Sequence, residues 1–322
     1  MGKDRRRIAA ELFDVAERNR RLAYANTRSE AKALERARAA GEAVEVSRGY
    51  YARASSATGM PARALSLWLV RAMSARHPDW VFSSFSAALV HGLQVSQNLL
   101  NEVHLAMDEH GNRLIRDPVI KCHLVRTLEF DLVDGIRVTP LAQTLLDCLC
   151  QADFARGLAI ADSALNWGLI DEARLRGYVK RFGFRRRGVQ TARKVVRWMD
   201  GRSENGGESM ARAVMIDLGF ELPELQVEIE DPMEPGRICR VDFYWKLPDG
   251  RVVIGELDGK CKYVLEGAQG LAPAIERLSH ERRREAHINL TGAKVLRFSF
   301  SEAMDASYMR CLLASAGVPR RS

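Results

Sequence analysis

Residues 238–260 have the sequence ICRVDFYWKLPDGRVVIGELDGK, and this stretch carries the strongest fold signal in the chain. Two strand-like runs flank Pro248-Asp249-Gly250, which is typical of a β-hairpin with glycine at the position that requires a positive φ. The polar residues of the first run fall on one face, and the apolar residues fall on the other. The second run is apolar on both faces over residues 252–254, which predicts a strand buried on both sides.

The loop length decides whether two acids of this hairpin meet. A three-residue loop centred on Asp249 places Asp242 directly opposite Glu256, with Cβ atoms about 5 Å apart. A two-residue Asp-Gly turn would shift the register by one and separate the pair. Like charges facing each other repel, and a divalent cation between them removes that repulsion. Two carboxylates, a phosphate oxygen and water are a common way to hold Mg²⁺.

The surrounding residues fit phosphodiester hydrolysis. A bound metal would polarise a phosphoryl oxygen and lower the pKa of an attacking water. Lys260 would place a positive charge beside the developing negative charge. Glu208 opens an apolar-periodic helix just before the strands and would add a further carboxylate. The alternative is a surface hairpin with solvated acids, and the buried run leading into two acids favours the site because buried acids need partners or a metal.

Charge is unevenly distributed along the 322 residues, whose net charge is +8. Residues 201–322 contain 17 Lys/Arg against 19 Asp/Glu, so residues 1–200 contain 32 against 22, a net +10. This excess indicates a polyanion partner, most simply double-stranded DNA, although a solvated basic surface is the alternative. No apolar run reaches the roughly 18 residues of a membrane span, and the N-terminus lacks a secretory signal, so we expect a cytoplasmic protein with no membrane partner.

The N-terminal segment has the parts of a winged helix-turn-helix. Apolar spacing predicts a helix over residues 5–20, and Thr27 or Ser29 caps a second helix that ends near residue 39. A short strand, a turn and a second strand follow over residues 43–52. The second helix would enter a DNA major groove. Small helical bundles with a hairpin that never touch DNA are the alternative. The predicted DNA-binding residues are Arg28, Arg36, Arg38 and, in the wing, Arg48.

The sequence that follows the N-terminal segment predicts a mixed α/β segment and then a domain boundary. Helices are expected over residues 61–75, 84–91, 140–150 and 154–167, and strands over 102–106 and 119–124. Residues 181–187, RFGFRRR, form a basic turn that contacts phosphate or is a solvated linker. The polar, glycine-rich residues 200–207 indicate a domain boundary. We therefore expect a winged-helix domain over 1–55, an α/β domain over 56–200 and a nuclease-like domain over 201–322.

Histidines and cysteines indicate no metal site. The spacings of His91, His104 and His123 match no metal-binding pattern, so they are interpreted as core or edge residues. Six scattered cysteines without a C-x-x-C pair predict free thiols.

The C-terminal third resembles the very-short-patch-repair-endonuclease-like branch of the PD-(D/E)xK nuclease superfamily. The resemblance covers residues 203–305 and depends on Val-Asp242-Phe, on Glu256-Leu-Asp258-Gly, on the Arg-rich run 282–285 and on the strand that contains Arg297-Phe298. It implies a restriction-endonuclease-like mixed sheet flanked by helices. It also implies Asp242 and Glu256 as ligands of Mg²⁺ or Mn²⁺, Asp258 as an additional acid and Glu208 as the first-helix acid. The superfamily has its lysine two residues after the second acid, and Asp258 holds that position after Glu256. Reading Asp258 as the second acid instead gives Asp258-Gly-Lys260, which restores a D-x-K motif.

The first half resembles the AbiEi family of type IV antitoxin-like transcriptional regulators. The resemblance is carried by Arg48-Gly-Tyr-Tyr51, by the segment 86–93 and by the segment 138–147, in which Gln143 replaces the usual arginine. It implies a DNA-binding winged helix joined to a second α/β domain, and a cognate toxin as a further partner. The expected fold class is thus α/β, α+β overall. Two functions remain open: a metal-dependent DNA endonuclease, and a regulator whose nuclease fold is inactive.

Overall fold

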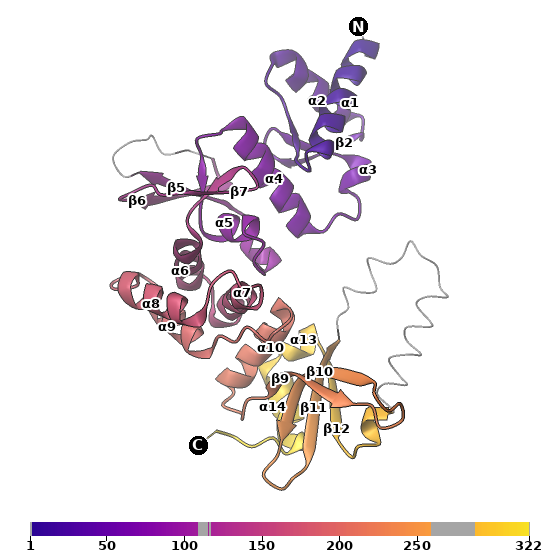
Figure 1. The fold of residues 1–322 in the computed structure, drawn as a ribbon. Helices are drawn as coiled ribbons and strands as arrows, with labels where there is room; N and C mark the ends of the chain where they lie inside the picture. The colour runs from indigo at the N-terminus through magenta and orange to yellow at the C-terminus, as the bar shows by residue number, and fades with distance from the viewer. Residues whose placement is uncertain (1, 109–114, 116, 259–286, 322) are drawn as a thin grey trace. The chain divides into compact units, whose positions relative to one another are not determined.

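The described part of the chain folds into helices and three β-sheets, which confirms the mixed α/β, α+β class (Figure 1). The computed structural model describes residues 2–108, 115, 117–258 and 287–321, with side chains from Arg6 onward. The chain divides into two compact units, Met1–Cys148 and Leu149–Ser322. Lys260, Cys261 and the Arg-rich run 282–285 lie outside the described residues. None of the described helices is both long and apolar enough to cross a membrane.

The first unit begins with two helices and a small antiparallel sheet. Its strands are in the order β1-β3-β2, and the strand β1 was not predicted. The helix α2 begins at a complete capping box, in which Thr27 and Glu30 bond each other's backbone N–H groups, as the sequence suggested for Thr27. The elements are α1 (Gly2–Arg18), β1 (Ala23–Tyr24), α2 (Arg28–Ala39), β2 (Ala43–Ser47) and β3 (Tyr50–Arg53). These are the parts expected of a winged helix-turn-helix, an assignment that stays a prediction.

This small sheet is buried on both faces. Ala43 and Tyr51 pack with α1 and α2, whereas Tyr50 and Ala52 pack into a second core together with Leu69 and other residues of the following helix. Because successive strand residues face opposite sides, the sheet joins the two cores. Both sides of the predicted 55/56 boundary lie in the compact unit Met1–Cys148, and a division at that boundary stays a prediction.

The rest of the first unit is a five-stranded sheet with helices. Its strand order is β6-β5-β4-β8-β7, with β5–β6 and β4–β8 parallel. The helices and strands expected over residues 61–151 are confirmed. The elements are α3 (Ala54–Ala57), α4 (Ala62–Arg76), β4 (Val81–Phe82), α5 (Ser84–Val90), η1 (Gln97–Leu99), β5 (Val103–Asp108), β6 (Ile120–Val125), β7 (Asp131–Val133), β8 (Ile136–Val138) and α6 (Leu141–Gln151).

The second unit starts with a group of helices, the first of which packs against α10 (Gly206–Asp217). These are α7 (Phe154–Asn166), α8 (Glu172–Phe182) and α9 (Val189–Trp198). A buried ion pair joins Arg212 of α10 to Asp162 of α7, with Nη2 and Oδ2 2.8 Å apart. The polar segment 200–207 thus connects packed helices inside the compact unit Leu149–Ser322, and a domain boundary at 200/201 stays a prediction.

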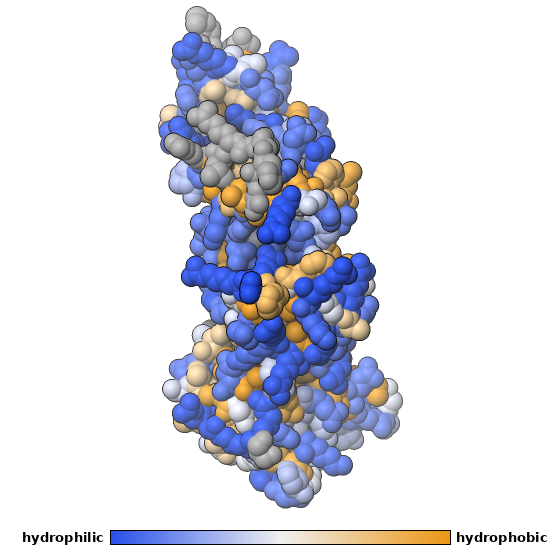
Figure 2. Space-filling view, turned by 90° about the vertical axis from the view of Figure 1, so that its left-hand side faces the viewer, coloured by the Kyte–Doolittle hydropathy of each residue, from blue (hydrophilic) through white to orange (hydrophobic). Residues whose placement is uncertain are grey.

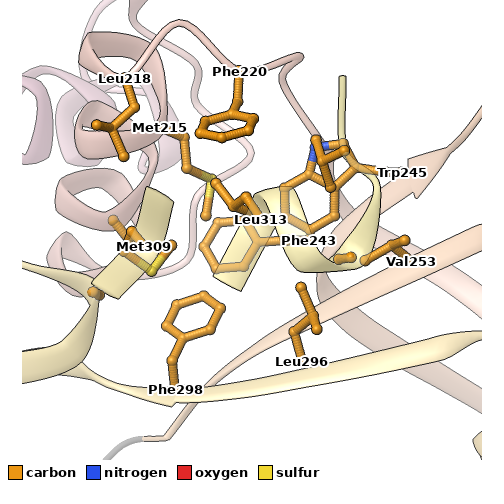
Figure 3. Packing of buried hydrophobic residues seen from close by; sticks show 14 of the residues in the cluster. Met215, Leu218, Phe220, Phe243, Trp245, Val253, Leu296, Phe298, Met309 and Leu313 are labelled. Atoms are coloured by element: carbon orange, nitrogen blue, oxygen red, sulfur yellow. The ribbon is translucent and has the colours of Figure 1, made fainter. Parts of the chain in front are cut away.

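A four-stranded mixed sheet completes the second unit. The order is β12-β11-β10-β9, antiparallel except for the parallel pair β11–β12. The strands are β9 (Glu224–Glu230), β10 (Ile238–Lys246), β11 (Val252–Asp258) and β12 (Lys294–Ser299), and the helices α13 (Phe300–Ala303) and α14 (Ala306–Ala316) follow. Residues of α10 and α14 cover one face of the sheet, and Phe243 lies among Leu313, Val253 and Phe298 in this core (Figure 3).

The opposite face of the sheet carries a smaller apolar cluster. Val241 and Ile254 pack there with Ile288 and Ala293. Val253 lies in the first core and Ile254 in the second, so β11 is buried on both faces. This confirms the prediction made from the apolar run 252–254.

Candidate active site

The β10–β11 hairpin has the register predicted for a three-residue loop. Phe243 pairs with Gly255, and the ladder continues regularly to Lys246 and Val252, which requires the three-residue loop centred on Asp249. Gly250 has a φ of +86°, as expected for its turn position. The regular ladder ends at Phe243–Gly255, one pair before Asp242 and Glu256. The two acids therefore stand where the strands stop pairing.

Asp242 bonds the neighbouring strand with its side chain. Its Oδ2 accepts a hydrogen bond of 2.9 Å from the backbone N–H of Leu257, and its Oδ1 lies 3.4 Å from Nε2 of Gln226. The carboxylate thus takes the place of a backbone acceptor at the end of the ladder. Two donors from different strands hold the orientation of this half-buried acid.

Gln226 connects two of the predicted acids. Its Nε2 donates to Oε2 of Glu208 at 3.0 Å and also contacts Asp242. Gln226 has a φ of +55°, a conformation uncommon outside glycine. Leu225 and Val227 would normally share a face, yet Leu225 packs in the core under α10 and Val227 in the opposite cluster. The left-handed residue between them accounts for this change of face and aims the amide at both carboxylates.

Glu208 is held at the beginning of α10. The helix is capped by Asn205, whose Oδ1 accepts from the backbone N–H groups of Gly207 and Glu208. The Glu208 side chain is buried and accepts from the backbone N–H of Glu204 at 2.8 Å and from the Asn205 amide. Hydrogen-bond donors at the start of the helix therefore hold the Glu208 carboxylate in place.

Glu256 and Asp258 lie near an arginine of β12. Glu256 is 9% exposed and stands beside Arg297 in the parallel β11–β12 register. Nη1 of Arg297 is 3.9 Å from Oδ1 of the exposed Asp258. This arginine places a fixed positive charge next to the acids, close to where Lys260 was expected to provide one. From its sequence, Arg297 was expected only as part of a strand and had no predicted role.

The predicted acids therefore fall into two pairs. Gln226 joins Glu208 to Asp242, and β11 carries Glu256 and Asp258. Within the described residues, no three of these four acids offer ligand atoms within 4.8 Å of one another, the spacing at which one ion could reach them all. Lys260 lies outside the described residues.

A different cluster meets that spacing criterion in the described part of the chain. It consists of Asp231, Glu234 and His287. Asp231 is buried and lies 3.0 Å from Nδ1 of His287, and Glu234 bonds Nη1 of Arg237 at 2.6 Å. These pairings connect the β9–β10 turn to the segment that precedes β12, and they account for the acids without an ion.

The four arginines predicted to bind DNA are all exposed. Arg28 and Arg36 lie on the outward face of α2, opposite the buried Ala33 and Ala37, and Lys32 shares this face by its spacing. Arg38 points toward β2, where Nη1 lies 3.8 Å from Glu45. Lys32 was not predicted as a DNA-binding residue, although its i, i+4, i+8 spacing with Arg28 and Arg36 places it on the same face.

Arg48 lies in the turn between β2 and β3. The turn is completed by Gly49, which has a φ of +78° and whose backbone N–H bonds Oε1 of Glu45 at 2.9 Å. Arg48 is thus presented at the tip of a structured hairpin.

The histidines predicted to be core or edge residues form hydrogen bonds within the first unit. Nδ1 of the buried His104 lies 2.8 Å from Nε2 of His123, and the two rings are stacked. Nε2 of His91 contacts the Thr139 carbonyl at 3.2 Å. The cysteines in the described residues are free thiols, as predicted: Cys122, Cys148, Cys150, Cys239 and Cys311.

Comparison with known proteins identifies relatives over about half of the chain. It is 33% identical over 168 residues to two uncharacterized proteins of Mycobacterium tuberculosis, one from strain CDC 1551 / Oshkosh and one from strain H37Rv. The match covers 52% of this chain and 58% of each relative, so the chain spans little more than half the length of these relatives. No family model matches the chain. Function therefore has to be inferred from the site.

Proposed function

We propose that this protein binds DNA and cleaves it with a metal-dependent endonuclease site in the second unit. One observation carries the proposal: Glu208 of α10 and Asp242 of β10 contact the same Gln226 Nε2 atom, at the end of the β10–β11 ladder. Acids from a helix and a strand that meet at the end of this ladder, with Glu256 on the neighbouring strand, provide an oxygen-rich site on a rigid framework.

The donors fit a hard divalent cation. Two carboxylates that share one amide donor repel each other, and a cation relieves that repulsion. Carboxylate and amide oxygens are ligands that suit Mg²⁺ and Mn²⁺. The amide of Gln226 can present its oxygen instead of its nitrogen by turning over, since the two atoms are nearly equivalent in shape. Glu208, Asp242 and the Gln226 amide would hold the ion, and Glu256 and Asp258 of β11 would act as additional acids.

Each residue has a role that its contacts support. The Leu257 N–H fixes the orientation of the Asp242 carboxylate, and the Asn205 amide together with the backbone N–H of Glu204 holds the Glu208 carboxylate. Arg297 would stabilise negative charge that develops on the phosphate, a role first assigned to Lys260. A bound Mg²⁺ or Mn²⁺ would supply Lewis-acid polarisation of the phosphate and a more acidic water.

A plasmid-nicking assay tests the proposal. We expect supercoiled DNA to be nicked with Mg²⁺ or Mn²⁺ and not with EDTA. We expect Asp242→Asn and Glu256→Gln each to reduce the rate at least about 100-fold, because each removes a charge that acts on the transition state. Asp249→Asn is the matched control, since Asp249 lies at the other end of the same hairpin and bonds Arg251. Metal-independent nicking, or equal rates for Asp242→Asn and Asp249→Asn, would contradict the proposal.

A second candidate is an antitoxin-like transcriptional regulator whose nuclease fold is inactive. It is favoured by the exposed cationic face of α2, formed by Arg28, Lys32 and Arg36 at a firmly capped helix. A cognate toxin would then be a partner. We expect a gel shift on the DNA upstream of the protein's own gene that weakens steeply with salt and falls with Arg36→Ala. Arg7→Ala, an exposed arginine of α1, is the control. The regulator is rejected if Arg36→Ala and Arg7→Ala bind alike.

A further inference from the structure

The connection between α8 and α9 exposes two aromatic side chains. Phe182 is 46% exposed and Phe184 is 68% exposed. At the level of α8 and α9, the face shown in Figure 2 has hydrophobic side chains lying between hydrophilic ones. Exposed phenylalanines this close together are unusual on a water-facing turn and indicate a binding surface. We define the α8–α9 tip as residues 181–187, RFGFRRR.

The same helical pair carries the positive charge of the chain. Residues 172–198 contain ten Lys/Arg and one Asp/Glu, a net +9. The remaining residues then contain 39 Lys/Arg and 40 Asp/Glu, a net −1. The basic excess that suggested DNA binding by the first 200 residues is thus concentrated in the second unit, on the helices that precede the candidate active site.

Arginines at the tip lie over the aromatic rings. The guanidinium carbon of Arg181 is 5.0 Å from the ring centroid of Phe182, and that of Arg185 is 5.1 Å from the centroid of Phe184. Each ring is therefore next to a cation that can contact a phosphate while the ring contacts a base.

The tip has a defined backbone. A Cβ on Gly188 would stand 1.8 Å from the Cys150 carbonyl oxygen, so the chain after the tip passes directly over the Cys150 backbone of the same unit. Gly188 has a φ of +79°, and Arg185 has a φ of +58°. Leu175 and Val179 of α8 and Val189 of α9 are buried below the tip. The aromatic and cationic side chains are consequently presented from a fixed framework.

We propose that the α8–α9 tip binds single-stranded DNA, with Phe182 and Phe184 stacking on bases and the tip arginines contacting phosphates. Unpaired bases offer flat faces to an aromatic ring, whereas a duplex hides these faces within its stack. The charge of +9 selects a polyanion over an apolar or basic protein partner. The choice of DNA rests on the proposed function, and a strand opened or distorted near the nuclease site is the substrate class that this surface would recognise.

Fluorescence anisotropy with a labelled oligo-dT, measured in EDTA, tests the proposal. We expect Phe182→Ala/Phe184→Ala to weaken binding at least about tenfold with little change in salt dependence, because stacking carries no charge. We expect Arg181→Ala/Arg185→Ala/Arg187→Ala to reduce the slope of log affinity against log salt by about 2, since each phosphate contact on a single strand contributes about 0.7.

Two controls separate this surface from general charge and from the active site. Lys246→Ala/Arg251→Ala/Arg310→Ala removes the same charge from exposed positions of the same unit and should leave most of the affinity intact. Asp242→Asn should bind oligo-dT normally, so loss of cleavage and loss of strand binding are distinguishable. The proposal is overturned if the tip variants bind as tightly as the control triple variant, if the phenylalanine pair has no effect, or if a duplex or an oligo-U of equal length binds more tightly than oligo-dT.

Discussion

Gln226 has a strained backbone conformation, and its side chain lies in the candidate active site. A non-glycine residue with a φ of +55° is less stable than in an ordinary strand by on the order of 1 kcal/mol. The contacts of its amide with Glu208 and Asp242 offset that cost. Strained residues of this kind are often found where a side chain must be held in a functional position.

Replacing the Gln226 amide by a carboxylate tests whether Glu208 and Asp242 leave room for a cation between them. Gln226→Glu brings a third negative charge to Glu208 and Asp242, so we expect the free energy of unfolding in EDTA to fall by about 1–3 kcal/mol relative to Gln226→Met. Gln226→Met is the matched control because it loses the hydrogen bonds without adding charge. Added Mn²⁺ should restore part of the loss in the Glu variant alone. Urea unfolding in both conditions measures this, and equal stability of the two variants in EDTA would contradict it.

His104 makes the first unit sensitive to acid. Burial, followed by the nearby His123 and Lys121, lowers the pKa of His104 to about 3. The unfolded chain has a histidine pKa near 6.5 and therefore binds the proton more strongly. Stability is thus lost as the pH falls below about 6.5, by about 2 kcal/mol at pH 5.

NMR titration of the His104 ring checks this value directly. We expect the ring to remain neutral down to about pH 4, while urea unfolding of the first unit shifts to lower denaturant concentration between pH 7.5 and pH 5. A midpoint near 6.5 for His104, with unchanged unfolding, would show that burial does not penalise its charge.

Among the elements, α7 and α10 are joined by the buried pair Asp162–Arg212. Burial raises the pKa of Asp162 to about 6, and Arg212 opposes this rise. Arg212→Met would leave an unpaired buried carboxylate, so we expect a loss of about 3–5 kcal/mol in the free energy of unfolding. The loss should be smaller at pH 5 than at pH 8, because the isolated carboxyl group then takes up a proton.

An exposed ion pair between α9 and α10 supplies the comparison. Lys194 bonds Asp217, and both side chains are about half-exposed. Lys194→Met should change the free energy of unfolding by no more than about 1 kcal/mol, as for surface pairs generally. Thermal or urea unfolding of both variants gives the two values, and similar losses for Arg212→Met and Lys194→Met would contradict the importance of burial.

The sequence predicted the β10–β11 hairpin better than it predicted the contacts between separate elements. The β10–β11 register follows from loop length and alternation, which are local, and it is confirmed from Phe243–Gly255 onward. The roles of Gln226 and Arg297 depend on β9 and β12, strands that reach the site only through the sheet order. A left-handed φ at a glutamine also has no sequence signal, since no glycine or asparagine marks it.

For the whole molecule, the division of the chain determines which fragments can fold. The boundary at 200/201 was predicted from a polar, glycine-rich segment, yet α7 packs on α10 across it and Lys194 of α9 bonds Asp217 of α10. A fragment of residues 149–322 keeps these contacts, and a fragment of residues 201–322 loses them and exposes Arg212. We expect 149–322 to unfold cooperatively and 201–322 to be insoluble or to lack a cooperative transition. Calorimetry and near-UV circular dichroism measure this, and a stable, cooperative 201–322 fragment would contradict the division.

The central claim is that Glu208, Gln226 and Asp242 form a site for a divalent cation. The most direct measurement is an anomalous difference map from crystals of the protein grown with Mn²⁺. We predict a peak within coordination distance of the Asp242 carboxylate that disappears in Asp242→Asn crystals. A peak at Asp231 and His287 instead, or no peak near Asp242 in Mn²⁺-saturated crystals, would contradict it.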